Sequence, residues 1–384
     1  MTKTLPEKRR HEFFVTCAPG LEPFLHEEIR ALKLSGHERQ VGGVRFVGTL
    51  SDAWRANLEL RTAVRVLLKV ARFEARDDAE LYRNVQSIDW SAHLAPEGTL
   101  RVDAHSKESA LEHTLFVEQR TKDAICDQIR EKTGVRPSVD LDDAQLGVYV
   151  HIFKDRCTVL LDTSGDSLHK RGWRKFQGRA PLAETLAAAV VLASGWDRRS
   201  PLVDPFCGSG TLLVEAALIA ANIAPGIFRE RFGFERWPGH DVRRFNSVRD
   251  EVRARGVLPK KLVLQGFDSD RDAIAGAKEN ALSAGLGASI QFECAPIERF
   301  EPKKGWNAWL ATNVPYGERI GDERDLMPTF ERFGAIVRER CHGWHIAILS
   351  GNENLSRALA IDFARRIPLQ NGSIECRLLL ADLA

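Results

Sequence analysis

Residues Ser200 to Thr211 restrict the possible folds more than any other part of the chain, because they predict a strand, a glycine loop and a helix start in immediate succession. The apolar pair Leu202-Val203 runs into Asp-Pro-Phe-Cys-Gly-Ser-Gly, and an apolar helix pattern follows. Gly208 and Gly210 permit a tight turn and let the backbone approach a ligand without a Cβ in the way. The segment therefore predicts an α/β fold with a ligand-binding edge.

From residue 182 onward, short apolar strands alternate with amphipathic helices. Strands are predicted at 202–203, 262–267, 289–294, 308–312, 345–349 and 375–381, and helices at 182–192, 211–222, 271–284 and 326–340. This alternation predicts a Rossmann-like, doubly wound domain with a mostly parallel sheet, because parallel strands need helical crossovers. Ligands of such a sheet bind outside the carboxyl ends of the strands.

The N-terminal half predicts small α+β layers. Strands are expected at 11–18, 43–47, 63–73 and 98–104, helices at 20–34, 51–58 and 111–132, and a hairpin at 147–153 and 156–162. Ser51 is a candidate N-cap, and the acidic residues around Asp77 and Asp78 suggest a loop. No βαβ unit of the nucleotide-binding type occurs, so one or two ferredoxin-like layers are expected.

At 384 residues the chain exceeds the usual size of one domain, and its composition changes most clearly between Ser164 and Pro181. This stretch is rich in glycine and in basic side chains, with Trp173 and Phe176 among them. Such a mixture is expected at a nucleic-acid surface. A solvated linker whose aromatic side chains attach it to a neighbouring domain is the alternative.

Composition argues against several classes of protein. The seven cysteines are scattered and never form a C-x-x-C pair, which argues against a zinc site or a disulfide framework and favours buried free thiols. No run of eighteen apolar residues and no signal peptide are present, so a cytoplasmic protein is expected. The formal net charge of +2 is uninformative, because a basic face can exist on a nearly neutral protein.

The glycine loop favours a ligand without phosphate. It lacks the complete G-x-G-x-x-G spacing of a dinucleotide site and the lysine of a P-loop, so nothing would neutralise a pyrophosphate. S-adenosylmethionine (SAM) is such a ligand. Asp204, Phe206, Cys207 and Gly208 are expected to hold its methionine end, with Cys207 serving as a small filler.

A second strand ends in acid at Asp268-Ser269-Asp270. A carboxylate at this position can accept both hydroxyl protons of a ribose, so Asp268, with Ser269 beside it, is a candidate cofactor contact. Asp270 is expected to cap the helix that begins near Arg271.

The segment Asn313-Val-Pro-Tyr316 follows another apolar strand and suits an acceptor amine. The lone pair of a purine exocyclic amine is delocalised, so an enzyme must hold the amine pointing at the methyl group. The Asn313 side-chain oxygen and the Val314 carbonyl offer two acceptors, Pro315 stiffens the turn, and Tyr316 offers a ring for stacking. Positioning would supply most of the rate, and neither a metal nor a covalent nucleophile is required.

The chain resembles the bacterial THUMP-domain RNA methyltransferases related to the large-subunit ribosomal RNA guanine-N2 methyltransferase. The resemblance rests on the segments 14–22, 42–46, 60–68, 122–125, 167–173, 180–188, 204–211, 312–321, 371–372 and 375–376. It implies a ferredoxin-like domain at 1–60, a THUMP RNA-binding domain at 61–165, a basic linker at 166–181 and a Rossmann-like methyltransferase domain at 182–384. It also implies RNA contacts by Lys107, Lys122, Arg136, Lys170, Arg171, Trp173 and Arg174.

Two positions depart from the family pattern. Val314 replaces the first proline of the usual Asn-Pro-Pro-Tyr, a change that related enzymes acting on transfer RNA tolerate. The usual adenine-binding aspartate is replaced by Cys294-Ala-Pro-Ile-Glu298, so Glu298 or backbone groups are expected to take its role. The second methyltransferase domain of some relatives is expected to be absent.

The resemblance implies a SAM-dependent RNA methyltransferase that modifies the N2 amine of guanine in 23S ribosomal RNA or its precursor. Three alternatives stay open. They are N6-adenine methylation of RNA or DNA, guanine-N2 methylation of transfer RNA, and a non-catalytic RNA-binding factor that kept the fold.

Overall fold

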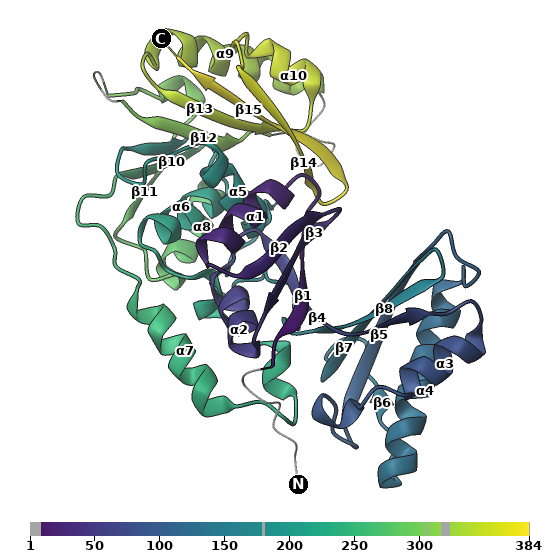
Figure 1. Ribbon diagram of the computed structural model, residues 1–384. Helices are drawn as coiled ribbons and strands as arrows, with labels where there is room; N and C mark the ends of the chain where they lie inside the picture. Colours follow the sequence, from purple (N-terminus) through teal and green to yellow (C-terminus); the bar gives the residue numbers. More distant parts are fainter. Residues whose placement is uncertain (1–8, 179–180, 304, 306, 316–322, 384) are drawn as a thin grey trace.

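The computed structural model of the protein describes residues 9–178, 181–303, 305, 307–315 and 323–383. Two sheets organise this part of the chain (Figure 1). The first has eight strands in the order β2-β3-β1-β4-β8-β7-β5-β6, and the second has seven in the order β11-β10-β9-β12-β13-β15-β14. The first sheet is built from the N-terminal half and the second from the C-terminal half, as the sequence predicts.

The eight-stranded sheet joins two α+β layers without a break, because β4 pairs with both β1 and β8. Its strands are β1 His11–Cys17, β2 Ser35–Gln40, β3 Gly43–Gly48, β4 Ala63–Glu74, β5 Thr99–Lys107, β6 Ser138–Val139, β7 Leu146–Phe153 and β8 Arg156–Asp162. Helices α1 Glu22–Ala31, α2 Leu50–Glu59, α3 Asp78–Gln86 and α4 Thr114–Thr133 accompany them. Burial alternates along β1 and β7, so one face of the sheet is packed and the other is open.

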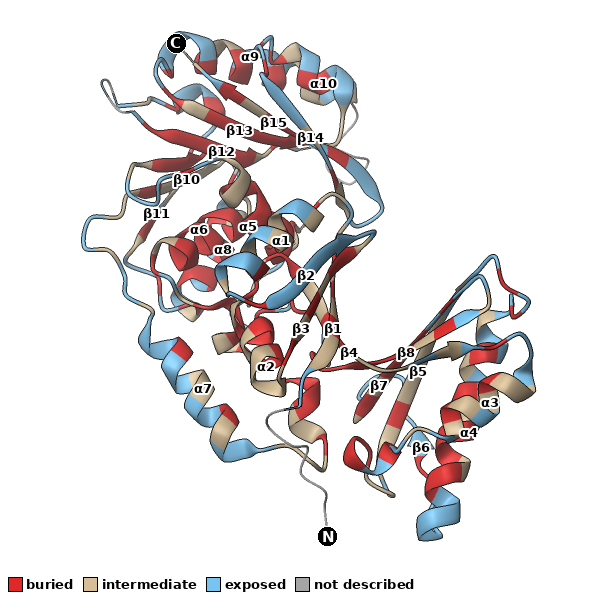
Figure 2. Ribbon diagram, viewed as in Figure 1, coloured by how far each residue is buried: buried red, intermediate tan, exposed pale blue. Residues whose placement is uncertain are grey.

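The seven-stranded sheet has the expected doubly wound form. Its strands are β9 Leu202–Asp204, β10 Leu264–Asp268, β11 Ile290–Cys294, β12 Trp309–Asn313, β13 His345–Ser350, β14 Arg365–Asn371 and β15 Ile374–Asp382. The first five are parallel, and β15 is antiparallel to both neighbours. The helices are α5 Glu184–Ala193, α6 Thr211–Ala220, α7 Val242–Ala254, α8 Arg271–Ser283, α9 Glu323–Arg340 and α10 Glu353–Ala358. Figure 2 shows that α5 and α6 are mostly buried, as their continuous apolar sequences require.

Several local predictions were wrong. Thr49, not Ser51, caps α2, because its side chain accepts from the Asp52 amide in a capping box. The acidic stretch around Asp77 begins a helix, since Asp77 caps α3. Strands β2, β6 and β14 and helices α7 and α10 were not predicted. None of the described helices is long and apolar enough to cross a membrane.

Candidate functional site

The glycine loop and the Asn313 segment lie at one edge of the seven-stranded sheet. Strands β9 and β12 are parallel neighbours, with Leu202 opposite Trp309 and Val203 opposite Leu310. The hydroxyl of Thr312 donates to Asp204 Oδ1 at 2.6 Å, which joins the ends of the two strands directly. The carboxyl ends of β9 and β12 therefore form one site, as parallel topology predicts.

The two glycines of the loop have different structural roles. Both have a positive φ, +51° at Gly208 and +76° at Gly210, a backbone region that side chains with a Cβ rarely adopt. A Cβ at Gly210 would come within 2.9 Å of the Phe292 ring, whereas a Cβ at Gly208 would meet no heavy atom within 4 Å. Gly210 thus permits close packing against β11, and the loop is open on the side of Gly208.

Asp204 is the buried acid of the site, with 2% of its surface exposed. Burial raises its pKa to about 7, and the nearby Asp268 charge acts in the same direction, against the hydrogen bonds from Thr312 and the Phe206 amide. Cys207 is also buried, and burial raises the pKa of its thiol well above the ordinary value. The expectation that Cys207 fills space agrees with this environment, because a protonated buried thiol is a weak nucleophile.

Asp268 lies at the tip of β10 and holds the glycine loop. Its Oδ2 accepts from the Gly208 amide at 2.9 Å, and its Oδ1 accepts from the Asp270 amide at 2.9 Å. Each carboxylate oxygen has a second lone pair, so the group can still accept from ribose hydroxyls. Asp270 caps α8 through the amides of Asp272 and Ala273, which confirms that prediction.

The two other predicted cofactor contacts lie near the tips of β10 and β11. Ser269 follows Asp268 and is exposed, and its carbonyl lies 3.6 Å from the Cys294 sulfur. Glu298 is exposed on a short turn, Ile297–Arg299, that follows β11. Cys294 itself is exposed, whereas the other six cysteines are buried, so the expectation of buried thiols is wrong at this position.

Asn313 is the last residue of β12 and carries the most informative polar atom of the site. Its Oδ1 is buried and has no hydrogen-bond partner within the described structure. The next residue, Val314, is 1% exposed, and its amide donates to the Leu349 carbonyl of β13. Pro315 is half-buried, and Tyr316 lies outside the described residues. A buried acceptor without a donor costs free energy, which a ligand amine would recover.

Asn280 on α8 is a site residue that the sequence analysis missed. Its Oδ1 accepts from the amides of Lys175 and Phe176 at 2.7 and 2.9 Å. Its Nδ2 donates to the carbonyls of Phe176 and Ser209, both at 3.0 Å. Asn280 therefore connects the segment before the seven-stranded sheet to the glycine loop. The only sequence signal was a polar residue on the buried face of a predicted helix.

The predicted RNA contacts Arg171 and Trp173 are contradicted by their burial, since each is 1% exposed. Arg171 pairs with Glu215 at 3.2 Å and donates to the Leu168 carbonyl at 2.7 Å, so its charge is compensated inside the protein. Arg174, with 13% of its side chain exposed, pairs with Glu184 at 3.0 Å. These three side chains hold the segment to its neighbours and are not available to phosphate.

The other predicted RNA contacts are at the surface. Lys122 and Arg136 share one partner, Asp123, and Lys170 pairs with Asp166. Lys107 is exposed at the end of β5.

Comparison with known proteins agrees with this architecture. Residues 171–379 match the RMKL-like methyltransferase domain, 75–162 match the THUMP domain and 12–67 match the RlmL ferredoxin-like domain. The chain is 44% identical to ribosomal RNA large subunit methyltransferase K/L of Methylococcus capsulatus, over 97% of this chain and 51% of that protein. The corresponding protein of Syntrophotalea carbinolica is 41% identical, over 97% of this chain and 54% of that protein. The chain thus spans about half the length of these two relatives.

Two solved structures share the complete arrangement. SMU.472, crystallised with S-adenosylhomocysteine (SAH), is 30% identical with a TM-score of 0.88, covering 98% of this chain and 99% of that chain. A predicted N6-adenine-specific DNA methylase from Listeria monocytogenes is 31% identical with a TM-score of 0.88, covering 98% and 97%. The expected SAM-dependent methyltransferase fold, preceded by ferredoxin-like and THUMP regions, is confirmed.

Proposed function

Because the chain belongs to the family of RMKL-like methyltransferase domains, we propose that it transfers a methyl group from SAM to the exocyclic N2 amine of guanine in 23S ribosomal RNA. The observation that carries the proposal is the buried Asn313 Oδ1, which has no hydrogen-bond partner among the described residues and lies at the end of the strand next to the glycine loop. This hydrogen-bond acceptor lies at the carboxyl ends of the parallel strands, where ligands of such sheets bind. The choice of ribosomal RNA as the substrate rests on the relatives that are named as large-subunit ribosomal RNA methyltransferases.

The cofactor half of the site is the loop between β9 and α6, together with the tips of β10 and β11. Asp204, Phe206, Cys207, Gly208 and Gly210 would hold the methionine end, and Asp268 and Ser269 the ribose, with Glu298 at the adenine end. SAM supplies a methyl group bound to a cationic sulfur. The chain's part is to hold the donor and the amine in line and to exclude water.

The acceptor half is the Asn313 loop. Asn313 Oδ1 would accept one N–H of the amine and the Val314 carbonyl the other, which turns the nitrogen lone pair toward the methyl carbon. The nitrogen–carbon bond would form as the carbon–sulfur bond breaks, which leaves SAH, and the amine nitrogen would lose one proton to solvent as the product leaves the site. Aligned acceptors of this kind typically contribute on the order of 100-fold or more to a rate.

A second candidate is N6-adenine methylation, which the Listeria monocytogenes structure favours by its description. The same two acceptors serve any purine exocyclic amine, so the loop alone does not separate the two. Guanine in RNA is the first choice for two reasons. The chain contains a THUMP domain, and two relatives are named as ribosomal RNA methyltransferases.

The test uses radiolabelled SAM and large-subunit ribosomal RNA from cells that lack this protein. We expect N2-methylguanosine after digestion to nucleosides, and N6-methyladenosine would contradict the choice of base. Asn313→Ala should retain SAH binding by calorimetry and lose methyl transfer at least about 100-fold. Asn84→Ala, a change on α3 where the side chain donates to the Glu80 carbonyl one turn earlier, is the matched control. Normal turnover by Asn313→Ala would refute the acceptor assignment.

A further inference from the structure

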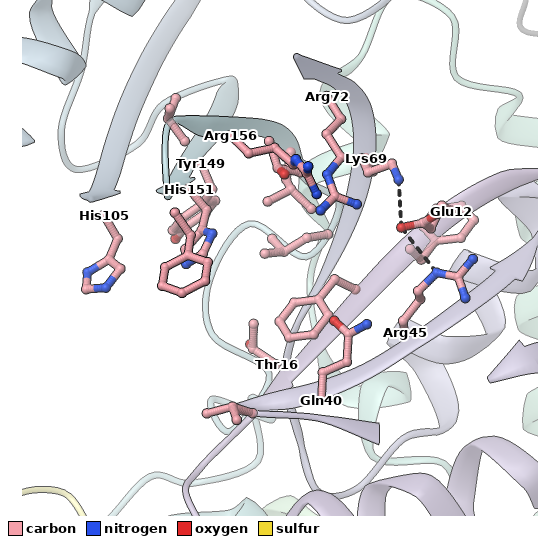
Figure 3. A pocket seen from close by; sticks show the side chains of 18 of the residues that line it. Glu12, Thr16, Gln40, Arg45, Lys69, Arg72, His105, Tyr149, His151 and Arg156 are labelled. Atoms are coloured by element: carbon pink, nitrogen blue, oxygen red, sulfur yellow. Dashed lines mark ion pairs between the residues drawn. The ribbon is translucent and has the colours of Figure 1, made fainter. Parts of the chain in front are cut away.

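The open face of the eight-stranded sheet contains a groove that none of the proposed catalytic residues line. Its volume is about 940 Å³, and side chains from β1, β2, β3, β4, β5, β7 and β8 surround it (Figure 3). We call it the open-face groove, and define it by His105, His151, Phe153, Arg72, Arg156 and Lys69. It spans the junction of the two α+β layers, because β4 and β8 pair at its centre.

Strand register places these side chains in rows across the sheet. His105 lies opposite His151, His151 opposite Thr158, and Thr158 opposite Arg72, so one row crosses four adjacent strands. In the next row, Phe153 lies opposite Arg156. Residues opposite each other point to the same face of a sheet. His105, His151, Phe153, Arg72 and Arg156 are all exposed. The groove therefore presents rings on one side and guanidinium groups on the other.

The charges of the groove are incompletely compensated. Lys69 and Arg45 both pair with Glu12, at 2.7 and 3.2 Å. Arg72 and Arg156 have no ion pair or side-chain hydrogen bond within the part of the chain that the structure describes. Figure 3 shows the two guanidinium groups pointing toward each other from β4 and β8. Two unpaired arginines that share a concave surface repel one another, and an anion between them would relieve this repulsion.

The rings supply surfaces on which flat groups can stack. The imidazoles of His105 and His151 are 5.6 Å apart with their planes inclined by 18°. Phe153 is 41% exposed although it is large and apolar. Unpaired bases stack on exposed aromatic and imidazole rings, whereas paired bases inside a helix do not offer their faces.

We propose that the open-face groove binds an unpaired segment of RNA, with bases on His105, His151 and Phe153 and phosphates between Arg72 and Arg156. The proposal deepens the proposed function, because it rests on RNA as the substrate. It places the RNA-binding surface on the open face of the sheet. The opposite face is covered by α4, where Lys122 and Arg136 already share Asp123.

The experiment measures fluorescence anisotropy of a labelled oligouridylate of about 12 nucleotides and of a blunt RNA duplex of similar length, over a range of salt concentrations. The test variants are Arg72→Gln/Arg156→Gln and His151→Ala/Phe153→Ala. The control variant, Arg130→Gln/Lys132→Gln, removes the same amount of charge from the end of α4, where both side chains pair with acidic neighbours. SAH binding by calorimetry must stay unchanged in all three, which shows that the site in the other sheet is folded.

We expect the wild type to bind the single strand at least about tenfold more tightly than the duplex. Arg72→Gln/Arg156→Gln should reduce the slope of log K against log salt by about 1.4, since each phosphate contact to a single strand contributes about 0.7. His151→Ala/Phe153→Ala should weaken binding at least about 30-fold, since each of the two lost stacks is worth at least about 1 kcal/mol. It should leave the salt slope unchanged, because stacking releases no counterions. The control should bind like the wild type.

Failure of this proposal can be told apart from failure of the proposed function. If the groove variants bind the single strand like the wild type while ribosomal RNA is still methylated, the groove is not the RNA site and the function stands. If the wild type binds the single strand through the groove but methylates no RNA, the groove proposal stands and the function falls. Loss of binding only in the α4 control, or equal affinity for duplex and single strand, would also overturn the groove proposal.

Discussion

Asp204→Asn should remove the free-energy cost of ionising a buried carboxyl group, a cost that lowers the stability of the wild type as the pH rises. Asp204 is 2% exposed, and burial is the largest cause of its pKa of about 7. Asparagine has nearly the same shape, and its Oδ1 can accept the hydrogen bonds that Thr312 and the Phe206 amide donate to the carboxylate. The substitution therefore changes the charge and leaves the local hydrogen bonds in place.

The direction and the size of the change in unfolding free energy follow from the pKa values of Asp204 in the folded and unfolded chain. The pKa rises from 3.8 in the unfolded chain to about 7 in the folded one, so the folded state binds this proton more tightly. The stability that protonated Asp204 contributes is fully present below pH 3.8 and is lost as the pH rises through 7. A shift of about three pH units corresponds to an upper limit of about 4 kcal/mol. The asparagine variant has no such loss, so it should gain on the wild type with rising pH.

The assay is urea denaturation of both proteins between roughly pH 4.5 and pH 8, followed by tryptophan fluorescence. The difference in unfolding free energy should move in favour of the variant by about 3 kcal/mol across this range, because the rest of the change falls below about pH 4.5. Asp272→Asn, an exposed acid in the first turn of α8, is the control and should show no such trend. A difference for Asp204→Asn that is constant with pH would refute the reasoning, since it would mean that the carboxylate ionises without cost.

Three further substitutions test how the site is held together. Asn280→Ala leaves buried amides and carbonyls unpaired, so it should lower the unfolding free energy by about 1–3 kcal/mol and weaken SAH binding in calorimetry. Gly276→Ala places a Cβ 2.0 Å from a ring atom of the linker phenylalanine and should cost about 1–3 kcal/mol in the same denaturation assay, whereas Gly287→Ala, with its nearest contact at 3.4 Å, should cost little. Arg171→Met breaks a buried ion pair and should lower the unfolding free energy by about 3–5 kcal/mol. Lys170→Met, which changes the exposed neighbouring residue, should leave the unfolding free energy nearly unchanged. Normal stability of Arg171→Met together with weaker RNA binding would show that Arg171 is a surface contact after all.

The core of the site could be predicted from the sequence because buried parallel strands leave a strong local signal. The apolar runs before Asp204, Asp268 and Asn313 end abruptly in polar residues, and parallel topology brings such ends to one edge. Strand β2 left no such signal. Its sequence Ser-Gly-His-Glu-Arg-Gln is exposed throughout, so backbone pairing with β3 alone makes it a strand. Helix α3 was missed because only Leu81 and Val85 form its buried stripe.

The segment after residue 165 shows why side-chain roles were harder to predict than the fold. Its sequence allowed either an RNA surface or a linker held by its aromatic side chains, and the burial of Trp173 supports the second interpretation. The partner of Arg171 is Glu215, which lies 44 residues further along the chain. In the sequence, a basic residue that pairs with a distant acidic residue cannot be distinguished from one that binds phosphate at the surface. The role of Asn280 was hidden for the same reason, since its partners are backbone groups of distant segments.

These contacts also join the eight-stranded sheet to the seven-stranded sheet. Arg61, just before β4, donates to the carbonyls of Leu218 and Ile223 at 3.3 and 2.8 Å, and Arg171 donates to the Arg61 carbonyl. Leu218 belongs to α6, the helix that begins at the glycine loop. Arg171 is buried and Arg61 is half-buried, so separating the two halves would break several hydrogen bonds between them at once. The open-face groove and the acceptor loop are thus held in a fixed relation, so an RNA held in the groove must match that spacing before its amine can meet Asn313. On this view, the chemistry at Asn313 accepts any suitably placed purine amine, and the shape of the RNA determines which one arrives.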